Sequence, residues 1–223
     1  MIESSAFPTP ESASADGLVA ISQSMSPELL IDAYRNGIFP WTANPVSWWS
    51  PDPRAVFMLQ PLKLKENLQR ALRKPFRITT NRSFRKVMET CAEVHSRNDQ
   101  TWIEPTFIEN YTKLHQSGFA HSIEAWDGND LVGGLYGVQV GSLFCGESMF
   151  HLQPDASKAI MALLLSGLSE NGFTLLDSQV PNEGTRFMGA VEIPRVEFLK
   201  HLRAGRDQVL DFPQIAKDDP EHP

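Results

Sequence analysis

Apolar and polar positions alternate most regularly in the second half of the chain. Residues 121–126 and 131–138 alternate as β-strands do, and the turn-forming residues 127–130 between them indicate a hairpin. Another strand-like run begins after Gly141 and continues to Phe150. The pattern therefore predicts successive strands joined by short turns.

A carboxylate interrupts the last of these runs. Side chains in a strand alternate between two faces, so Cys145, Glu147 and Met149 are expected to point the same way. Burying a carboxylate between apolar neighbours is costly unless the charge has a partner. Glu147 therefore indicates either a structural ion pair or a working residue.

The next thirty residues predict a helix followed by a strand. Apolar residues in the segment 156–168 have helical spacing, with Asp155 as the expected N-cap and Asn171-Gly172 as the expected end. Residues 173–180 have the pattern of a short buried strand. A strand, helix and strand in succession connect parallel strands of one sheet.

This arrangement brings a second carboxylate toward the first. Leu175, Asp177 and Gln179 share one face of the second strand, and Asp177 is expected near Glu147. Taken alone, Asp177 is more simply a turn residue at a strand end. The two carboxylates together with Gln179 favour a functional cleft.

Further helices are predicted from capping residues and apolar spacing. They run from Ser26-Pro27-Glu28 to Gly37, from Asn81 to about Val94, from Glu104-Pro105 to about Gln116, and from Pro194 to about Leu202. From Arg206 onward the residues are mostly polar and acidic, and a frayed tail is expected.

Length and composition set the class of protein. The 223 residues are enough for one large domain, or for a large and a small one, with a substantial core. The two cysteines, Cys91 and Cys145, have no metal-like spacing and are expected to be core thiols in a reducing compartment. No apolar run is long enough to span a bilayer, and the acidic N-terminus does not resemble a signal peptide. A cytoplasmic protein without metal, cofactor or membrane partner is expected.

Charge is distributed unevenly along the chain. The net charge is −7, yet residues 63–86 contain nine lysines and arginines against the single acid Glu66. This basic stretch is either a phosphate-binding patch or an ordinary solvated helix face. The solvated face is the simpler interpretation.

Tryptophans cluster near the N-terminus. Trp41, Trp48 and Trp49 are three of the five tryptophans in the chain, and prolines surround them. They could join two domains, or line a site for flat or apolar groups such as nucleic-acid bases. The sequence favours neither alternative.

Several motifs in a fixed order resemble one known family. They are AYRNGIFPW (33–41), WWSPDPRA (48–55), TWI (101–103), HSIE (121–124), LVGGLYG (131–137), LFCGESMF (143–150) and DSQ (177–179). With them the chain resembles the bacterial leucyl/phenylalanyl-tRNA–protein transferases, from about residue 6 to about residue 202.

The resemblance implies an activity and a fold. Members of the family transfer leucine or phenylalanine, and less well methionine, from aminoacyl-tRNA to the α-amine of proteins that begin with Arg or Lys, which marks those proteins for degradation. The implied fold is α+β. A small N-terminal domain (1–60) packs on a larger GNAT-like domain (61–205) with a mixed sheet, and a polar tail (206–223) follows.

The resemblance also implies roles for individual residues. Asp177 and Gln179 match positions at the reacting amine, and Glu147 matches the residue that meets the basic end of the acceptor. Positions near the terminal adenosine or the loaded side chain are matched by Trp48, Trp49, Tyr34, Trp102 and Tyr111. Candidates for an apolar side-chain pocket are Phe144, Met149 and Leu135, although each fits plain sheet core equally well.

Two regions match the family less closely. The tRNA-contacting cluster of the family aligns only loosely with the basic stretch, where Arg70, Arg73, Lys74 and Arg77 are the candidates. Gly184 stands where the family commonly has a histidine, so a step that depends on that histidine does not carry over.

Two other classes of protein compete with this interpretation. A GNAT enzyme that uses acetyl-coenzyme A would cradle pyrophosphate on a glycine-rich turn before a helix. The corresponding residues 151–157 contain no glycine, and Asp155 would repel phosphates. A non-enzymatic RNA-binding protein would account for the basic stretch but not for the paired carboxylates.

Overall fold

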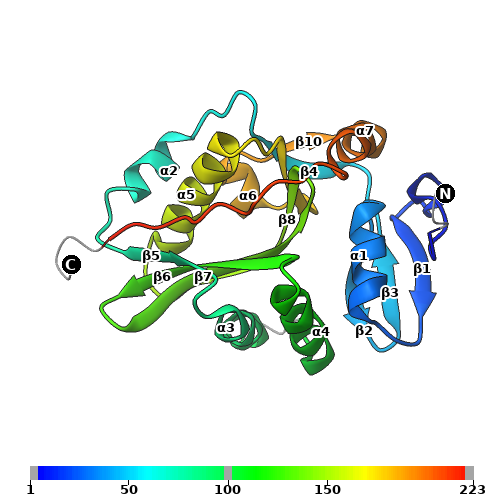
Figure 1. Ribbon diagram of the computed structural model, residues 1–223, viewed down its shortest axis with the longest axis horizontal. Coiled ribbons are helices and arrows are strands. Elements are labelled where there is room, and N and C mark those ends of the chain that lie inside the picture. The colour runs from blue at the N-terminus through cyan, green and yellow to red at the C-terminus, as the bar shows by residue number, and fades with distance from the viewer. Residues whose placement is uncertain (1–4, 98–101, 219–223) are drawn as a thin grey trace.

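The structure contains two sheets with helices packed around them (Figure 1). It is a computed structural model that describes residues 5–97 and 102–218; Thr101, the first residue of the TWI motif, lies outside the described residues. The smaller sheet has the order β1-β3-β2, with β1 (Leu18–Ser22), β2 (Phe39–Ala43) and β3 (Val46–Trp49). The larger sheet has the order β10-β4-β9-β8-β7-β6-β5. Its strands are β4 (Arg54–Met58), β5 (Arg77–Thr80), β6 (Ala120–Asp127), β7 (Asp130–Val140), β8 (Leu143–His151), β9 (Leu175–Gln179) and β10 (Val191–Ile193).

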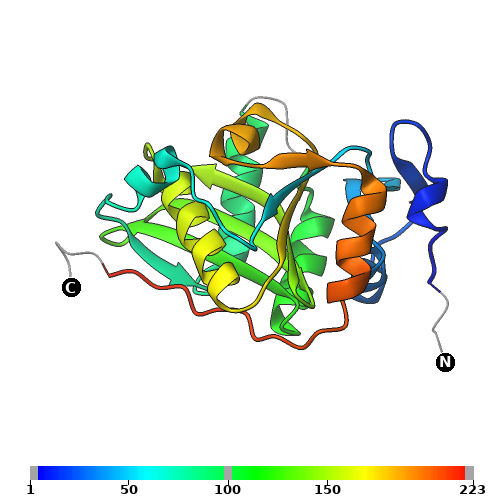
Figure 2. The same ribbon diagram turned by 90° about the horizontal axis from the view of Figure 1, so that it is seen from above.

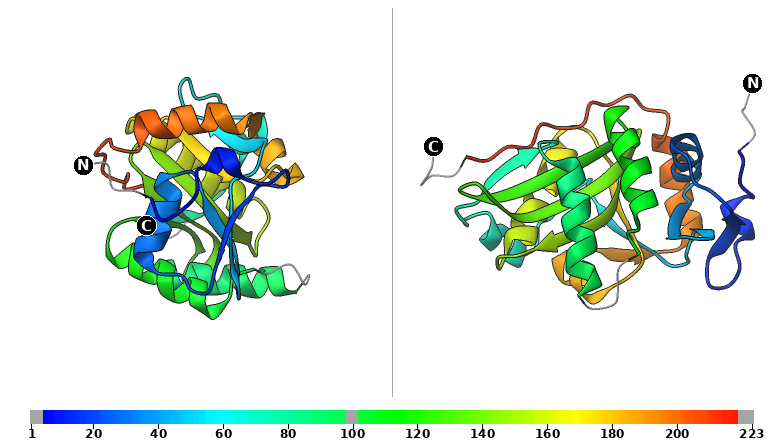
Figure 3. Two further views of the ribbon diagram at one scale, coloured as in Figure 1. Left: turned by 90° about the vertical axis from the view of Figure 1, so that its right-hand side faces the viewer. Right: turned by 90° about the horizontal axis from the view of Figure 1, so that it is seen from below.

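Helices cover both faces of the larger sheet. The described helices of the whole structure are η1 (Pro10–Ser12), α1 (Pro27–Arg35), α2 (Glu66–Ala71), α3 (Phe84–Ser96), α4 (Pro105–Gln116), α5 (Ala156–Glu170), α6 (Glu183–Met188) and α7 (Arg195–Gly205). On one face lie α3 and α4, as the view from below shows (Figure 3), and on the other lie α2, α5 and α6 (Figure 1). The core is correspondingly divided into two apolar clusters, one on each side of the sheet.

The predicted strand, helix and strand are confirmed as β8, α5 and β9. β8 and β9 pair in parallel, whereas the other strand pairs of the larger sheet are antiparallel, so the sheet is mixed. The helix begins and ends where expected, but Asp155 does not cap it through its side chain. The residue adopts a left-handed conformation with φ 70°, and its carboxylate contacts Lys158 and Lys74 instead.

The start of α3 differs from the prediction. The helix begins at Phe84, and Asn81 lies before it with φ 59° and accepts a hydrogen bond from the Ser122 backbone. The backbone N–H of Ser83 donates to the buried carboxylate of Glu124 on β6 at 3.2 Å. A residue distant in sequence therefore satisfies the helix end, which local patterns do not reveal. By contrast, Ser26 caps α1 as predicted.

The expectation of a frayed C-terminal tail is wrong for its described part. Residues 206–218 run back along the larger domain, as seen from above (Figure 2). The ring of Phe212 stacks on His121 with centroids 4.0 Å apart, and Ile215 is also buried. Lys217 then forms a backbone bridge to Ile78 on β5, an edge strand of the larger sheet. Phe212 and Ile215 hold this segment against the larger domain. The sequence analysis did not predict this, because most residues of the segment are polar.

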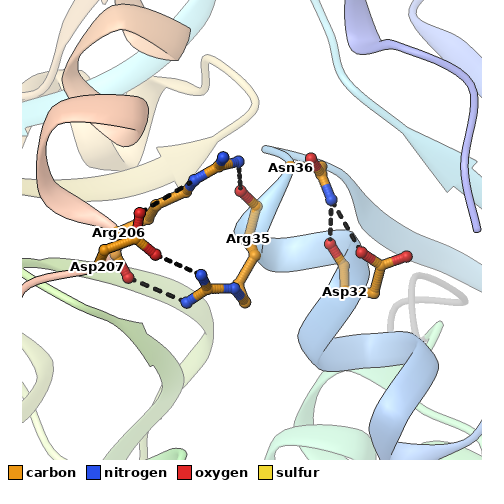
Figure 4. Close-up of polar contacts among 5 residues, drawn as sticks. All are labelled: Asp32, Arg35, Asn36, Arg206 and Asp207. Carbon is orange, nitrogen blue, oxygen red and sulfur yellow. Dashed lines mark hydrogen bonds and ion pairs between the residues drawn. The ribbon is translucent and has the colours of Figure 1, made fainter. Parts of the chain in front are cut away.

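The small N-terminal part packs on the larger domain, as expected, but the boundary lies earlier than residue 60. Strand β4 belongs to the larger sheet, so residues 54–58 are part of the larger domain. Contacts between the ends of α1 and α7 help to join the two parts (Figure 4). Arg35 and Arg206 each donate to the other's backbone carbonyl, and Arg35 pairs with Asp207.

Candidate active site

Three strands carry a β-bulge where they approach the same region. In β8, Gly146 pairs with Gly137 and Ser148 with Tyr136, so Glu147 is the extra residue. By the same comparison of registers, Ser178 is extra in β9 and Trp41 is extra in β2. Bulges re-aim side chains and are frequent beside active sites.

The bulge in β8 overturns one sequence-based expectation. Cys145 lies in the apolar cluster beneath α3 and α4, whereas Met149 packs against the cluster on the α5 side. One extra residue changes the phase of the alternation, so Cys145 and Met149 face opposite sides of the sheet. Strict alternation had placed both on the same face as Glu147.

Glu147 is held by neutral hydrogen-bonding groups. The side-chain amide of Gln179 donates to Oε1 at 2.6 Å, and the hydroxyl of Tyr111 donates to Oε2 at 3.5 Å. Tyr34 and Tyr111 are buried and hydrogen-bond to each other. Withdrawal from water raises the pKa of Glu147 to about 7, although the hydrogen bonds from Tyr34 and Gln179 act in the opposite direction. Near neutral pH the carboxyl group is thus divided between its two protonation states.

Asp177 is fixed differently. It is fully buried, and Arg54 donates to both of its oxygens, from Nε at 2.9 Å and from a terminal nitrogen at 2.7 Å. The backbone N–H of Gln179 also donates to Asp177, at 2.9 Å. Asp177 and Glu147 therefore lie close together, as predicted, and Gln179 links them. The sequence analysis did not identify Arg54. A buried carboxylate on β9 needs a cation nearby, and this requirement was the available signal.

Two cavities meet at Glu147. The first has a volume of about 780 Å³ and the second about 290 Å³. Four residues line both: Trp102, Glu147, Ser178 and Asn182. The apolar lining of the first cavity includes Leu135, Met149, Met161, Leu176 and Met188. The second is lined further by Phe39, Pro40, Trp41, Gln179 and Val180.

The predicted substrate-binding residues are divided between cavity and core. Leu135 and Met149 line the first cavity, and Trp102 lines both. Tyr34 and Tyr111 lie buried beside Glu147.

Phe144 packs against Phe212 in the core, which supports its interpretation as sheet core. Trp48 is fully buried and donates to Ser22 on β1, so it stabilises the N-terminal part. Trp49 contacts the ring of Trp41, and Trp41 is the tryptophan of this cluster that lines the second cavity. The bulge at Trp41 could not be seen in the sequence.

The predicted tRNA-contacting residues lie on α2, directly after it and at the start of β5. Arg70, Arg73 and Lys74 are exposed, and Lys74 lies 3.5 Å from Asp155. Arg77 is half-buried with its guanidinium over the ring of Trp126. Gly184, on α6, lines the first cavity. Within the described residues, the structure contains no helix that is both long and apolar enough to cross a membrane.

Comparisons with known proteins show the family of the chain. The family described as leucyl/phenylalanyl-tRNA protein transferase matches residues 56–203, and its N-terminal domain matches residues 23–52. A leucyl/phenylalanyl-tRNA–protein transferase of Shewanella sp. (strain W3-18-1) is 47% identical over 92% of this chain and 89% of its own length. One from Legionella pneumophila (strain Paris) is 44% identical over 93% and 92%.

Solved structures show a weaker likeness. A conserved protein from Staphylococcus epidermidis aligns with a TM-score of 0.44 and 9% identity over 79% of this chain and 68% of its own. The identification therefore depends on sequence, over nearly the whole chain. The chain belongs to the leucyl/phenylalanyl-tRNA–protein transferases, and it is an aminoacyltransferase that acts with aminoacyl-tRNA and protein substrates.

Proposed function

We propose that this enzyme transfers leucine or phenylalanine, and less well methionine, from tRNA to the α-amine of proteins that begin with Arg or Lys, and so marks them for degradation in the cytoplasm. The observation that carries the proposal is the meeting of two cavities at Glu147. Two substrates can enter from different sides and react where the cavities join.

The first cavity suits the aminoacyl donor. Its lining includes Met149, Met161 and Met188, and methionine side chains adapt to ligands of different shape. Such a wall can accept a branched leucine and a flat phenylalanine alike. Trp102, on the border of both cavities, offers an aromatic face to the terminal adenosine.

The second cavity suits the acceptor. Glu147 offers a carboxylate to the positively charged N-terminal residue, which is favourable charge-assisted recognition. An acidic N-terminal residue would be repelled by the same group. The aromatic rings of Phe39 and Trp41 can pack along the aliphatic part of an Arg or Lys side chain.

The chemistry requires positioning and a proton acceptor. The donor ester is already activated, so no covalent enzyme intermediate is needed. An α-amine with a pKa of about 7.7–8.0 is mostly protonated at pH 7 and must lose a proton before it attacks. Holding the amine beside the ester can contribute about 7–11 kcal/mol at best, and a general base adds about 100- to 10,000-fold.

Glu147 fits the role of proton acceptor better than Asp177. Its pKa of about 7 is close to that of the amine, and it borders both cavities. Asp177 is buried with both oxygens bound to Arg54, so it positions Gln179. Glu147 takes one proton from the ammonium group, the neutral nitrogen attacks the ester carbonyl, and a second proton passes from that nitrogen to the departing 3′ oxygen, which leaves one proton on the new amide.

A transfer assay tests the proposal. Purified enzyme should move labelled leucine from leucyl-tRNA to peptides that begin with Arg or Lys, and not to peptides that begin with Asp or acetylated Arg. Equal labelling of all peptides, or none, would contradict it. Filter binding to charged tRNA, uncharged tRNA and acetyl-coenzyme A separates the proposal from the two competing classes.

A further inference from the structure

One rim of the first cavity combines a cation with an exposed aromatic ring. Lys158 and Phe187 both line this cavity, from α5 and α6. The Lys158 ammonium lies 5.8 Å from the centre of the Phe187 ring, and 63% of Phe187 is exposed. Neither residue is needed for the core, and neither contacts Glu147 or Gln179 in the structure's hydrogen bonds.

The same rim is connected to the basic stretch. Asp155 lies between Lys158 at 2.7 Å and Lys74 at 3.5 Å. Two cations share one carboxylate, so the cluster carries a net positive charge. Figure 1 shows α2, α5 and α6 on the same side of the larger sheet, which places Arg70, on α2, on the same side as Lys158 and Phe187. An anionic chain that crosses α2 would reach the cavity here.

The cavity is also too large for one amino acid. Its volume of about 780 Å³ lies within the range of roughly 300–1,000 Å³ that holds a drug-sized ligand. A leucine or phenylalanine side chain fills only part of it, so the terminal nucleoside has room as well. The nucleotide before it would then emerge at the rim.

We propose that Lys158 and Phe187 form a subsite for the single-stranded RNA immediately before the terminal adenosine of the donor. Lys158 binds the phosphate that precedes the adenosine, and Phe187 stacks on the next base. Single-stranded nucleic acids are commonly bound in this way, by cations along the backbone and aromatic rings against the bases. The inference rests on the proposed function, because it assigns the path of the same aminoacyl-tRNA.

Three small donors separate the phosphate from the base. They are phenylalanyl-adenosine, the same compound with a 5′-phosphate, and a cytidylyl-adenosine dinucleotide that carries phenylalanine. We define the phosphate gain as the kcat/KM of the 5′-phosphorylated compound divided by that of phenylalanyl-adenosine. The base gain is the kcat/KM of the dinucleotide divided by that of the 5′-phosphorylated compound. With wild-type enzyme and an Arg peptide, each gain should be about tenfold, equivalent to about 1.4 kcal/mol.

Each variant should remove one gain. Lys158→Gln should abolish the phosphate gain, so that phenylalanyl-adenosine and its 5′-phosphate are used with equal kcat/KM. Phe187→Ala should abolish the base gain and keep the phosphate gain. Asp155→Asn should enlarge the phosphate gain, because phosphate no longer competes with a carboxylate for Lys158, and asparagine tolerates the left-handed backbone of this position.

The controls are an exposed lysine and an exposed aromatic residue elsewhere. Lys113→Gln on α4 and Phe119→Ala after it should leave both gains unchanged. Wild-type gains near one, or gains that survive in Lys158→Gln and Phe187→Ala, would overturn the subsite while transfer itself stands. Loss of the phosphate gain in Asp155→Asn would overturn it too. No transfer from any donor by wild-type enzyme would instead count against the proposed function.

Discussion

Two carboxylates lie close together in this site, and their surroundings give them different chemistry. Arg54 compensates for the charge of Asp177, whereas the hydrogen bonds to Glu147 come from the neutral side chains of Gln179 and Tyr111. Asp177 is therefore fixed in an ion pair, and Glu147 can exchange a proton near neutral pH. The difference between the roles arises from the partners and not from the residue type.

Glu147→Gln should remove a pH-dependent step. Because the ionised carboxylate accepts the proton, kcat/KM for an Arg peptide should rise as pH increases through about 7, the pKa of Glu147, and then level off. The acceptor amine adds its own ionisation in both enzymes. The ratio of wild-type to variant kcat/KM, measured from pH 5.5 to 9, should therefore isolate Glu147, rising about tenfold per pH unit below 7. A ratio that does not change with pH would show that the ionised form of Glu147 is needed neither for proton transfer nor for recognition of the acceptor.

Arg54 and Asp177 should act as one structural unit. Arg54→Met or Asp177→Asn alone leaves an uncompensated buried group, and each should lower the free energy of unfolding by about 3–5 kcal/mol. The double variant should lose less than the sum of the two, since the first change already removes the pair. Denaturant unfolding measures this coupling. Independent, additive losses would mean that the ion pair contributes little.

At the scale of elements, the site is assembled from irregular strands. The bulges at Glu147, Ser178 and Trp41 bring three strands from two sheets to the junction of the cavities. Regular strands would have placed these side chains differently, because each bulge changes the local alternation and twist. The irregularities therefore account for the geometry of the site.

Gly137→Ala should test the bulge in β8. A Cβ at Gly137 would lie 2.2 Å from the Cys145 carbonyl oxygen, so the strands must shift. We expect a loss of stability of about 1–3 kcal/mol and a larger loss of activity, because Glu147 follows the shift. Gly146→Ala is the matched control for stability, since its Cβ would meet Leu176 at an ordinary 3.7 Å. Equal thermal stability of the two variants would contradict the argument.

The sequence predicted those features of the fold and site that depend on residues close together in the chain. The spacing in α5 and the polar end of β9 were enough to bring Glu147 and Asp177 together. The bulge at Glu147, the partnership of Asp177 with Arg54 and the contact of Glu124 with the start of α3 were not predicted. Each of these depends on residues far apart in the sequence, which periodicity does not report.

At the scale of the whole molecule, an acidic protein must attract an anionic substrate. The net charge of −7 opposes tRNA, so the basic stretch must act locally, within the reach that salt allows. Of its exposed members, Arg70 on α2 and Arg73 directly after it are near α5 and α6 (Figure 1), whereas Arg85 and Lys86 lie on α3, on the opposite face of the sheet. An anionic chain that approaches over α2 meets Arg70 and Arg73 first.

Replacing Arg70 and Arg73 by glutamine should weaken binding of whole tRNA and flatten its salt dependence. The slope of log K against log salt should fall by about one for each lost phosphate contact. Both side chains are exposed and form no ion pair with another residue in the ranges 5–97 and 102–218, so the fold should be unaffected. Transfer from phenylalanyl-adenosine, which lacks a stem, should stay near wild type. An unchanged affinity and slope would make the basic stretch an ordinary solvated surface.

The pairing of Arg54 with Asp177 also bears on how the chain is made. The two residues are separated by 123 positions. At a synthesis rate of about 5–20 residues per second, Asp177 is added roughly 6–25 s after Arg54. Strand β4 is the first strand of the larger sheet along the chain. During this interval its neighbours in the sheet, β9 and β10, have not yet been synthesised. A nascent chain therefore cannot complete this centre before β9, which carries Asp177, has been synthesised.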